Sequence, residues 1–230
     1  MVLASALSLP AAAQRTTMSG GLVADGDVAD FQISPNGQYV VFRADKDTDG
    51  KDELYSVRLS TGSIVPISGA VVSGGNVAPG FQISPDSARV VFTGDLVTDT
   101  VAELFSAPIA TANSRVTLSG AVVSGGNVSS FQISPGSARV VFLGDLATDG
   151  VTELFSAPIA TVNKIGRASC RERVWGNLDL TFQISPDSAR VVFLGDLVTD
   201  TVTELFSAPI ATANSRVTLS GAVVSGRDVF

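Results

Sequence analysis

The sequence contains no histidine, a single cysteine and only three lysines. Without histidine, Ser-His-Asp and Cys-His nucleophile systems, histidine general bases and histidine-ligated zinc sites are excluded. The single cysteine, Cys170, excludes a disulfide framework and a cysteine-based metal site. No Gly-x-Ser-x-Gly elbow, Walker loop or Gly-x-Gly-x-x-Gly follows an apolar run. The sequence therefore predicts a protein that is not an enzyme by itself.

Basic residues are also scarce. The chain has 15 Lys and Arg against 22 Asp and Glu, which gives a net charge of −7. Four of these basic residues and one acidic residue lie in the segment Lys164 to Val174, so the rest of the chain carries −10. Such a surface repels the phosphates of nucleic acids, and no apolar run is long enough to span a bilayer. We therefore expect no nucleic-acid partner and no membrane span.

What the sequence does contain is repetition. The stretch Phe81 to Gly125 returns at Phe182 to Gly226 with two changes, Thr93 to Leu194 and Ala102 to Thr203. Related copies begin at Phe31 and Phe131, so the starting phenylalanines are 50, 50 and 51 residues apart. A period of this size is typical of propellers, solenoids and tandem arrays.

Each copy is predicted to form four short strands. In the second copy these are Phe81–Ile83, Ala88–Phe92, Glu103–Ile109 and Arg115–Leu118. Ser-Pro-Asp-Ser at residues 84–87 predicts a tight hairpin, because proline fixes φ and Asp or Ser side chains bond the backbone ahead. The two central strands lack a clean apolar–polar alternation, so both of their faces should be buried. A blade between two neighbours has this property, whereas a two-sheet sandwich would put the repeats in inequivalent places.

The recurring Ile-Ser-Pro-Asp turn, the Arg-Val-Val-Phe strand, the Asp-containing loop and Glu-Leu-Tyr or Glu-Leu-Phe (Glu53–Tyr55, Glu103–Phe105) resemble the TolB-type WD40-like β-propeller repeat. The resemblance covers about residues 18 to 230 and implies an all-β propeller of about four four-stranded antiparallel blades. These would form a closed four-bladed ring or an open arc of a larger propeller, since the family often closes with six or more copies. Repeats of this type occur in periplasmic scaffold proteins, in secreted proteins and as the propeller half of prolyl-oligopeptidase-like peptidases.

The repeats divide the chain into a leader, a lead-in and four blades. The expected bounds are 1–13 for a partial signal peptide, 14–30 for the lead-in and tail of a partial repeat, and 31–80, 81–130, 131–181 and 182–230 for the blades. Met18 to Val23 matches the tail of a repeat, Leu118 to Val123, so the ends look cut from a longer array. An open arc would expose the apolar face of each terminal blade and predicts self-association.

The first 13 residues form a short apolar run that ends in small residues before polar Gln14 and Arg15. This is typical of the apolar core and cleavage site of a secretory signal, although the basic start of such a signal is missing. The alternative is an apolar N-terminal strand. The leader predicts export to a periplasm or to the exterior.

One segment, Lys164 to Val174, interrupts the third repeat at its expected outer strand. Its reverse translation resembles a common short-read sequencing adapter read in frame, over its whole length. A basic binding patch and a reactive Cys170 thiol are the functional alternatives. We interpret the segment as an artefact.

The strongest chemical motif is the acidic run from Asp45 to Glu53. Asp45, Asp47, Asp49 and Glu53 stand at positions 1, 3, 5 and 9 of this run, with Gly50 at position 6 and the Lys51 carbonyl at position 7. Calcium gathers six to eight oxygens from such short loops, although the usual glutamate at position 12 is absent. The loop is therefore a candidate calcium site, and the alternative is an acidic hairpin turn.

The later repeats keep only three acids in this loop, as in Asp95, Asp99 and Glu103. Three oxygens from one loop would bind calcium poorly, so we interpret these acids as turn residues. A glycosidase-like pair of carboxylates is also disfavoured, because acids at equivalent positions of successive blades are spread apart.

These observations predict a secreted or periplasmic propeller that works as a non-catalytic binding or scaffold module. Its partner would be a protein or envelope component, no cofactor is certain, and calcium is the one candidate ion. The alternatives are the propeller part of a prolyl-oligopeptidase-like hydrolase whose catalytic domain is absent, and a calcium-binding surface protein.

Overall fold

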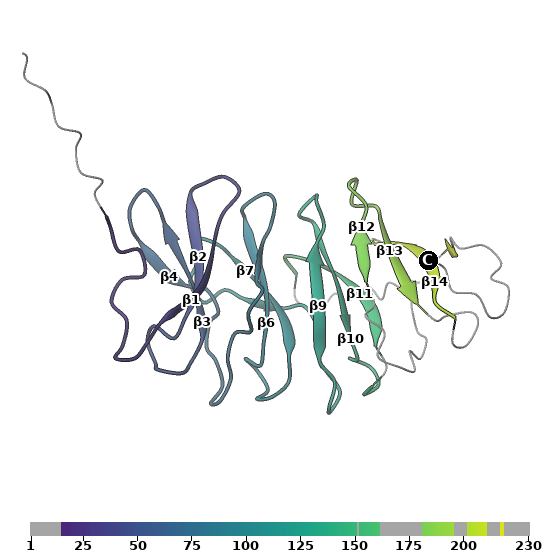
Figure 1. The fold of residues 1–230 in the computed structure, drawn as a ribbon, viewed down its shortest axis with the longest axis horizontal. Helices are drawn as coiled ribbons and strands as arrows, with labels where there is room; N and C mark the ends of the chain where they lie inside the picture. Colours follow the sequence, from purple (N-terminus) through teal and green to yellow (C-terminus); the bar gives the residue numbers. More distant parts are fainter. Residues whose placement is uncertain (1–14, 151, 162–180, 196–201, 211–216, 219–230) are drawn as a thin grey trace, which may run out of the picture.

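The structure is a computed structural model, and it describes residues 15–150, 152–161, 181–195, 202–210 and 217–218. All regular elements among these residues are β-strands, arranged in four antiparallel sheets. Figure 1 shows the sheets in a row that follows the order of the chain. We call them blades 1 to 4.

Each blade is a meander in which consecutive strands pair. Blade 1 contains β1 (Val28–Ile33), β2 (Tyr39–Ala44), β3 (Glu53–Arg58) and β4 (Ile64–Pro66). Blade 2 contains β5 (Gln82–Ile83), β6 (Arg89–Gly94), β7 (Glu103–Pro108) and β8 (Val116–Thr117). Blade 3 contains β9 (Val128–Ile133), β10 (Arg139–Gly144) and β11 (Glu153–Pro158). Blade 4 contains β12 (Phe182–Ile184), β13 (Arg190–Gly195), β14 (Glu204–Pro209) and β15 (Val217–Thr218).

This confirms the predicted all-β class and the four-stranded antiparallel unit in blades 1, 2 and 4. The outer strand expected in blade 3 falls outside the described residues, as do Lys164 to Val174, Cys170 and the leader. The four sheets do not pair with one another, which is common to both expected arrangements, the closed ring and the open arc, and Figure 1 shows blades 1 and 4 at opposite ends of the row.

The two central strands of every blade share one register. Aromatic residues pair directly across them, as Phe92 of β6 does with Phe105 of β7. The four equivalent ring pairs stack with centroids 5.4 to 5.7 Å apart. Cross-strand aromatic pairs stabilise a sheet beyond the area that they bury. The repeated Val-Val-Phe and Leu-Phe sequences thus fix the register of each blade.

The Ser-Pro-Asp-Ser turn is built by its own side chains, as its sequence predicts. The hydroxyl of Ser84 accepts a hydrogen bond from the N–H of Arg89 (2.9 Å) and donates to Asp86 (2.5 Å). Asp86 also accepts the N–H of Ala88 (3.0 Å). Ser87 closes the turn with φ of +61°, a left-handed conformation that is uncommon outside glycine.

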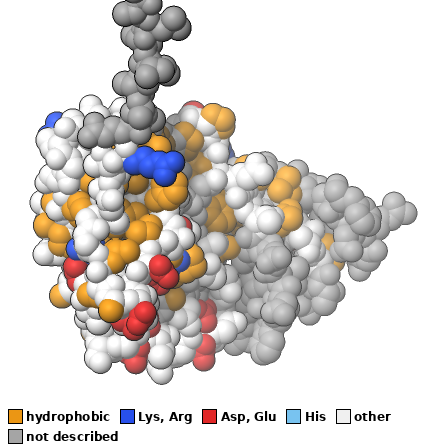
Figure 2. Space-filling model, turned by 60° about the vertical axis from the view of Figure 1, so that its left-hand side comes forward, with side chains coloured by type: hydrophobic (Ala, Val, Ile, Leu, Met, Phe, Trp, Pro, Cys, Tyr) orange, Lys and Arg blue, Asp and Glu red, His pale blue; other side chains and the backbone are white. Residues whose placement is uncertain are grey.

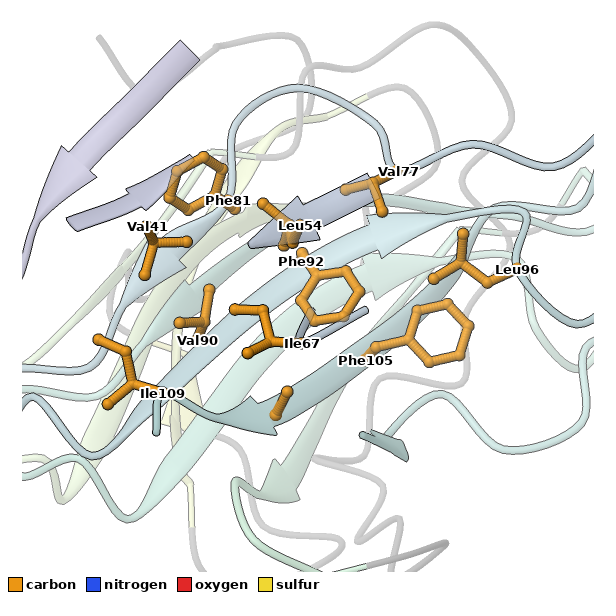
Figure 3. Close-up of a cluster of buried hydrophobic side chains, with 11 residues drawn as sticks. Val41, Leu54, Ile67, Val77, Phe81, Val90, Phe92, Leu96, Phe105 and Ile109 are labelled. Carbon is orange, nitrogen blue, oxygen red and sulfur yellow. The ribbon is translucent and has the colours of Figure 1, made fainter. Parts of the chain in front are cut away.

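Neighbouring blades pack face to face through apolar side chains. Figure 3 shows this for the first interface, where Val41 and Leu54 of blade 1 meet Val90, Phe92 and Phe105 of blade 2. All five of these side chains are fully buried. Equivalent clusters join blades 2 and 3 and blades 3 and 4. Both faces of an internal blade are therefore covered, which confirms the prediction from the missing alternation.

Two polar contacts also recur between blades. The side chain of Gln82 on β5 donates to the carbonyl of Phe131 (3.1 Å) and accepts the N–H of Ile133 (3.2 Å), both on β9 of the next blade. The hydroxyl of Ser137 accepts the N–H of Asp86 (3.0 Å) from the turn of the preceding blade. Equivalent bonds link blade 1 to blade 2 and blade 3 to blade 4, as follows: Gln32 to Phe81, Asn36 to Ser87, Ile184 to Gln132, and Gly136 to Ser188.

Candidate functional site

The acidic loops and the connections between blades come together at one end of the blades. The loops join the two central strands of a blade, and the Ser-Pro-Asp-Ser turns lie at the opposite end, because consecutive hairpin turns alternate along a meander. We call the surface formed by the β2–β3, β6–β7 and β10–β11 loops the acidic rim. The loop of blade 4 lies mostly outside the described residues, and so do its Asp196 and Asp200.

The first aspartate of each described loop accepts two hydrogen bonds, one from the incoming connection and one from its own loop. One carboxylate oxygen of Asp95 accepts the N–H of Asn76 in the incoming connection (2.5 Å). The other accepts the N–H of Thr100 across the loop (3.2 Å). Asp45 and Asp145 make the same pair of bonds in their own blades. These aspartates therefore fasten the loop to the connection.

The connection contributes an asparagine that joins two blades. The side chain of Asn127 accepts the N–H of Ala102 from blade 2 (2.8 Å), and the backbone N–H of Asn127 donates to the carboxylate of Asp145 in blade 3. Asn76 does the same between blades 1 and 2. Two glycines precede each asparagine, and a Cβ on Gly125 (φ +87°) would lie 2.7 Å from the carboxylate of Asp149. A glycine is thus required at position 125 by its positive φ and by this close approach.

Each described loop carries an exposed aspartate near its end. Asp49, Asp99 and Asp149 occupy equivalent positions in three successive blades, and all three are exposed. A hollow of about 590 Å³ separates the β6–β7 loop of blade 2 from the connection that follows β8. It is lined by Val97–Val101, Glu103 and Ala121–Asn127. The rim therefore carries an exposed carboxylate at this equivalent position of each described loop, and in blade 2 the hollow lies beside it.

The glutamate that begins the second central strand is buried in blades 2, 3 and 4. Glu103 is 6% exposed and accepts the N–H of Val97 within its own loop (3.2 Å). Burial raises the pKa of Glu103 above its ordinary value of 4.5, against the opposing effect of hydrogen bonds from loop N–H groups. Glu153 and Glu204 are buried at the equivalent positions. This residue supports its loop from inside and is not presented to solvent.

The structure places all five predicted calcium ligands in or beside the β2–β3 loop of blade 1. Both oxygens of Asp45 accept backbone N–H bonds, from Asp27 and Gly50, and these bonds lower its pKa. Asp47 pairs with the ammonium of Lys46 (2.9 Å), which also lowers its pKa, and Asp49 is exposed.

Tyr55 brings two of these acids together. Its hydroxyl donates toward Asp47 (3.1 Å) and Glu53 (3.3 Å). Burial, and then the charges of Glu53 and Asp47, raise the pKa of Tyr55 well above its ordinary value, so the phenol stays protonated. The ammonium of Lys51 lies 4.0 Å from Glu53. Within the described residues, no three acidic or cysteine side chains converge as a ready-made metal site. Calcium binding stays a prediction.

Sequence reasoning missed the asparagines and glutamines that join the blades. Their signal is present, because Gly-Gly-Asn recurs in the connections and Gln follows each starting phenylalanine. The partner of each amide lies about 25 or 50 residues away in another repeat, for instance Ala102 for Asn127 and Phe131 for Gln82. Only the stacking of repeats reveals these pairs.

Comparison with solved structures bears on the fold. A prolyl endopeptidase structure matches with a TM-score of 0.53 and 14% identity, over 90% of this chain and 32% of that one. The blades are those of a β-propeller. Two further solved structures also match this chain. They are TolB from Acinetobacter baumannii (TM-score 0.45, 12% identity, 84% of this chain and 43% of that one) and a putative TolB from Agrobacterium tumefaciens (TM-score 0.49, 17% identity, 83% of this chain and 64% of that one).

The chain thus spans 32% to 64% of the length of these three structures. No protein-family model and no curated protein matches this chain. The β-propeller fold predicted from the TolB-type repeat is confirmed.

Proposed function

We propose that this chain is a non-catalytic binding module and that its acidic rim binds a cationic segment of a polypeptide partner. The observation that carries this proposal is the recurrence of an exposed carboxylate at one position per blade, in Asp49, Asp99 and Asp149. Each lies in a loop whose first aspartate is hydrogen-bonded to the incoming connection, so the charges are held on a fixed frame.

The energetics favour many weak contacts over one strong contact. An exposed ion pair contributes only about 0.5 kcal/mol. Several such pairs on one rigid surface act together, because binding of the first places the others at high local concentration. The net charge of −7 also attracts a cationic partner over distance at low salt. Binding should therefore weaken steeply as ionic strength rises.

The test compares two double variants that lose the same charge from opposite ends of the blades. Asp99→Asn/Asp149→Asn alters the acidic rim, and Asp86→Asn/Asp187→Asn alters the opposite turns. We expect the rim variant to weaken binding of a labelled oligolysine peptide, followed by fluorescence anisotropy, about fivefold. The turn variant should bind like the parent. Equal weakening by both variants would mean that only net charge matters and would contradict the proposal.

A second candidate is the propeller part of a larger hydrolase. The match to a prolyl endopeptidase structure over 90% of this chain favours it. The identity of 14% supports a common fold and no more. Sequencing the intact gene tests this candidate: an α/β-hydrolase domain in the same reading frame would support it. Peptide turnover by the 230-residue chain itself would contradict the non-catalytic proposal.

Calcium binding by the loop from Asp45 to Glu53 is a further proposal, and the exposed carboxylate of Asp49 supports it. An ion that binds only the folded protein must raise its melting temperature. Millimolar calcium should therefore raise the Tm of the parent, and Asp49→Asn should reduce the rise, whereas Asp99→Asn should not. An unchanged Tm of the parent would contradict calcium binding and would favour the alternative interpretation of this loop as an acidic hairpin turn.

Export to a periplasm or to the exterior is proposed from the leader at residues 1–13, which lies outside the described residues. No helix among the described residues is long and apolar enough to cross a membrane. Detection of the mature chain outside the cytoplasm, with its new N-terminus after Ala13, would test the proposal.

A further inference from the structure

The row of blades ends in two faces whose equivalents are covered by a neighbouring blade everywhere else in the molecule. On blade 1, Phe42 and Tyr55 at the centre of this face are buried, with Met18 of the lead-in packed against them, and the exposed part lies on β1. On blade 1, Val28, Phe31 and Ile33 of β1 are 40%, 65% and 58% exposed. The equivalent side chains of the next blade are buried against blade 1, with Val77 at 1% and Phe81 at 2%. Figure 2 shows hydrophobic side chains gathered at this end of the molecule. A hollow of about 280 Å³ there is lined by Met18, Ser19, Val28, Phe31, Ile33, Val40 and Phe42.

Blade 4 presents the complementary face. Val192 and Leu205 are partly exposed, whereas the equivalent Val141 and Leu154 of blade 3 are buried against blade 4 at 0% and 3%. Val192 and Leu205 line a second hollow, of about 290 Å³, together with Leu194 and residues of β12. In the internal interfaces, this set of side chains is what packs on the next blade.

A polar contact that recurs in the three internal interfaces is absent at the outer face of blade 4. The side chain of Gln183 on β12 is exposed and makes no hydrogen bond to the described residues, whereas the side chains of its equivalents Gln32, Gln82 and Gln132 all reach the next blade. The groups that they contact are the carbonyl of the starting phenylalanine and the N–H two residues later. On blade 1 these groups belong to Phe31 and Ile33.

We propose that the 230-residue chain associates head to tail, with blade 4 of one copy docked on blade 1 of the next. The contact would continue the inter-blade interface that the chain already makes three times, with Gln183 of one copy bonded to Phe31 and Ile33 of the other. The two faces lie at opposite ends of the row (Figure 1), so a single copy does not join them in this structure. A contact between two different faces builds rings or filaments rather than closed twofold dimers.

One feature of blade 1 weakens the proposed contact. In blades 2, 3 and 4 the turn ends in Ser87, Ser137 and Ser188, whose hydroxyls each accept an N–H from the preceding blade. Blade 1 has Gly37 at this position, with φ of +67° close to the +59° of Ser137. A Cβ on Gly37 would meet no atom within 4 Å. Gly37→Ser therefore supplies the missing hydroxyl without strain beyond that of the other blades.

The decisive experiment blocks one face at a time. Phe31→Asp spoils the face of blade 1, and Leu205→Asp spoils the face of blade 4, because each buries a charge in the contact. Sedimentation velocity in the presence of a reductant, which prevents disulfides through Cys170, should show the parent associating as its concentration rises. Each variant alone should remain a monomer. A mixture should form a one-to-one dimer and nothing larger, since each variant keeps the face that the other has lost.

Several results would overturn the proposal. A parent that stays monomeric at every concentration would indicate ring closure within one copy. Association of Leu205→Asp without Phe31→Asp would indicate blade 1 pairing with itself, and association of both variants alone would indicate unspecific aggregation. Circular dichroism establishes that each variant folds.

Two milder variants at exposed positions keep the test independent of folding. We expect Gln183→Ala to weaken association, and Gly37→Ser to strengthen it, each by about threefold to tenfold, the effect of one or two hydrogen bonds. Opposite or absent shifts in both variants would contradict the specific interface.

Discussion

At the scale of single residues, blade 1 departs from its neighbours at positions where the other blades agree. Arg89, Arg139 and Arg190 begin the second strands of their blades and donate through Nε to the hydroxyls of Ser106, Ser156 and Ser207 at 2.7, 2.8 and 2.6 Å. Blade 1 has Tyr39 at this position. The hydroxyl of the equivalent Ser56 is buried and has no hydrogen-bond partner among the described residues. Burial of an unpaired hydroxyl costs stability.

Restoring the arginine should stabilise blade 1. In Tyr39→Arg, the guanidinium can reach Ser56 as it reaches Ser106 in blade 2, and we expect an increase of about 0.5 to 1.5 kcal/mol in the free energy of unfolding. Urea denaturation measures it. Tyr39→Lys is the control, because a lysine cannot reproduce the planar donor fork, and the proposed pairing is wrong if both variants behave alike.

The buried glutamate of blade 2 should make stability depend on pH. Because burial raises the pKa of Glu103, the folded chain holds this proton more tightly than the unfolded chain. The contribution of Glu103 is then most favourable below 4.5 and is lost as the pH rises through the folded pKa. Glu103→Gln keeps an acceptor for the N–H of Val97 and has no such loss. Its stability relative to the parent should rise between about pH 3.5 and about pH 7.

The same comparison with Asp99→Asn controls for the loss of one negative charge, because Asp99 lies in the same loop but is exposed. Denaturation curves of the parent and of both variants at the two pH values give the six free energies needed. A constant difference between Glu103→Gln and the parent would show that the carboxyl titrates alike in the folded and unfolded chain.

At the scale of elements, the strands could be predicted because the repeat presents the same pattern four times. The strands expected in the second copy correspond to β5–β8 within two residues at each end. In blades 1 and 3 the first strand begins at Val28 and Val128, three residues before the phenylalanine that marks the repeat. A bulge lies there, between Val28 and Asp30 in blade 1, and such an irregular pairing leaves no periodic signal.

The loops were predictable in type but not in role. The sequence shows which loops carry acids, yet burial separates Glu103, turned inward, from exposed Asp99. That distinction depends on the neighbouring blade and connection, which lie far away in the sequence. The hydrogen bond that joins Asp95 to the incoming connection likewise depends on the backbone N–H of Asn76.

The glutamine contacts between first strands should carry measurable stability. Gln82→Ala removes one bond to the carbonyl of Phe131 and one to the N–H of Ile133, and it leaves these groups without their partner. We expect a loss of about 1 to 3 kcal/mol in the free energy of unfolding. Gln183→Ala is the matched control, since its side chain is exposed, and it should change the stability of the monomer by less than about 0.5 kcal/mol. Equal losses in both variants would assign the effect to strand propensity.

At the scale of the whole molecule, stability should follow position in the row. Each blade contacts only its neighbours, so the total is approximately a sum of blade terms and interface terms. Blades 2 and 3 are covered on both faces, and the buried clusters join them to blades 1 and 4. Blade 1 has a neighbour on one face only, and its first strand exposes Phe31 and Ile33. A closed ring would have no such gradient, because all its blades would be equivalent.

Hydrogen exchange followed by mass spectrometry distinguishes these cases. In the open row, amides of β6, β7 and β10 should exchange most slowly and those of β1 fastest, because opening of the terminal blade breaks one interface and opening of an internal blade breaks two. The measurement belongs at low protein concentration, where we expect the chain to be monomeric. Raising the concentration should then slow exchange in β1 selectively if a second copy covers that face, and Phe31→Asp should abolish the slowing. Uniform protection in all blades at every concentration would instead describe a single cooperative ring.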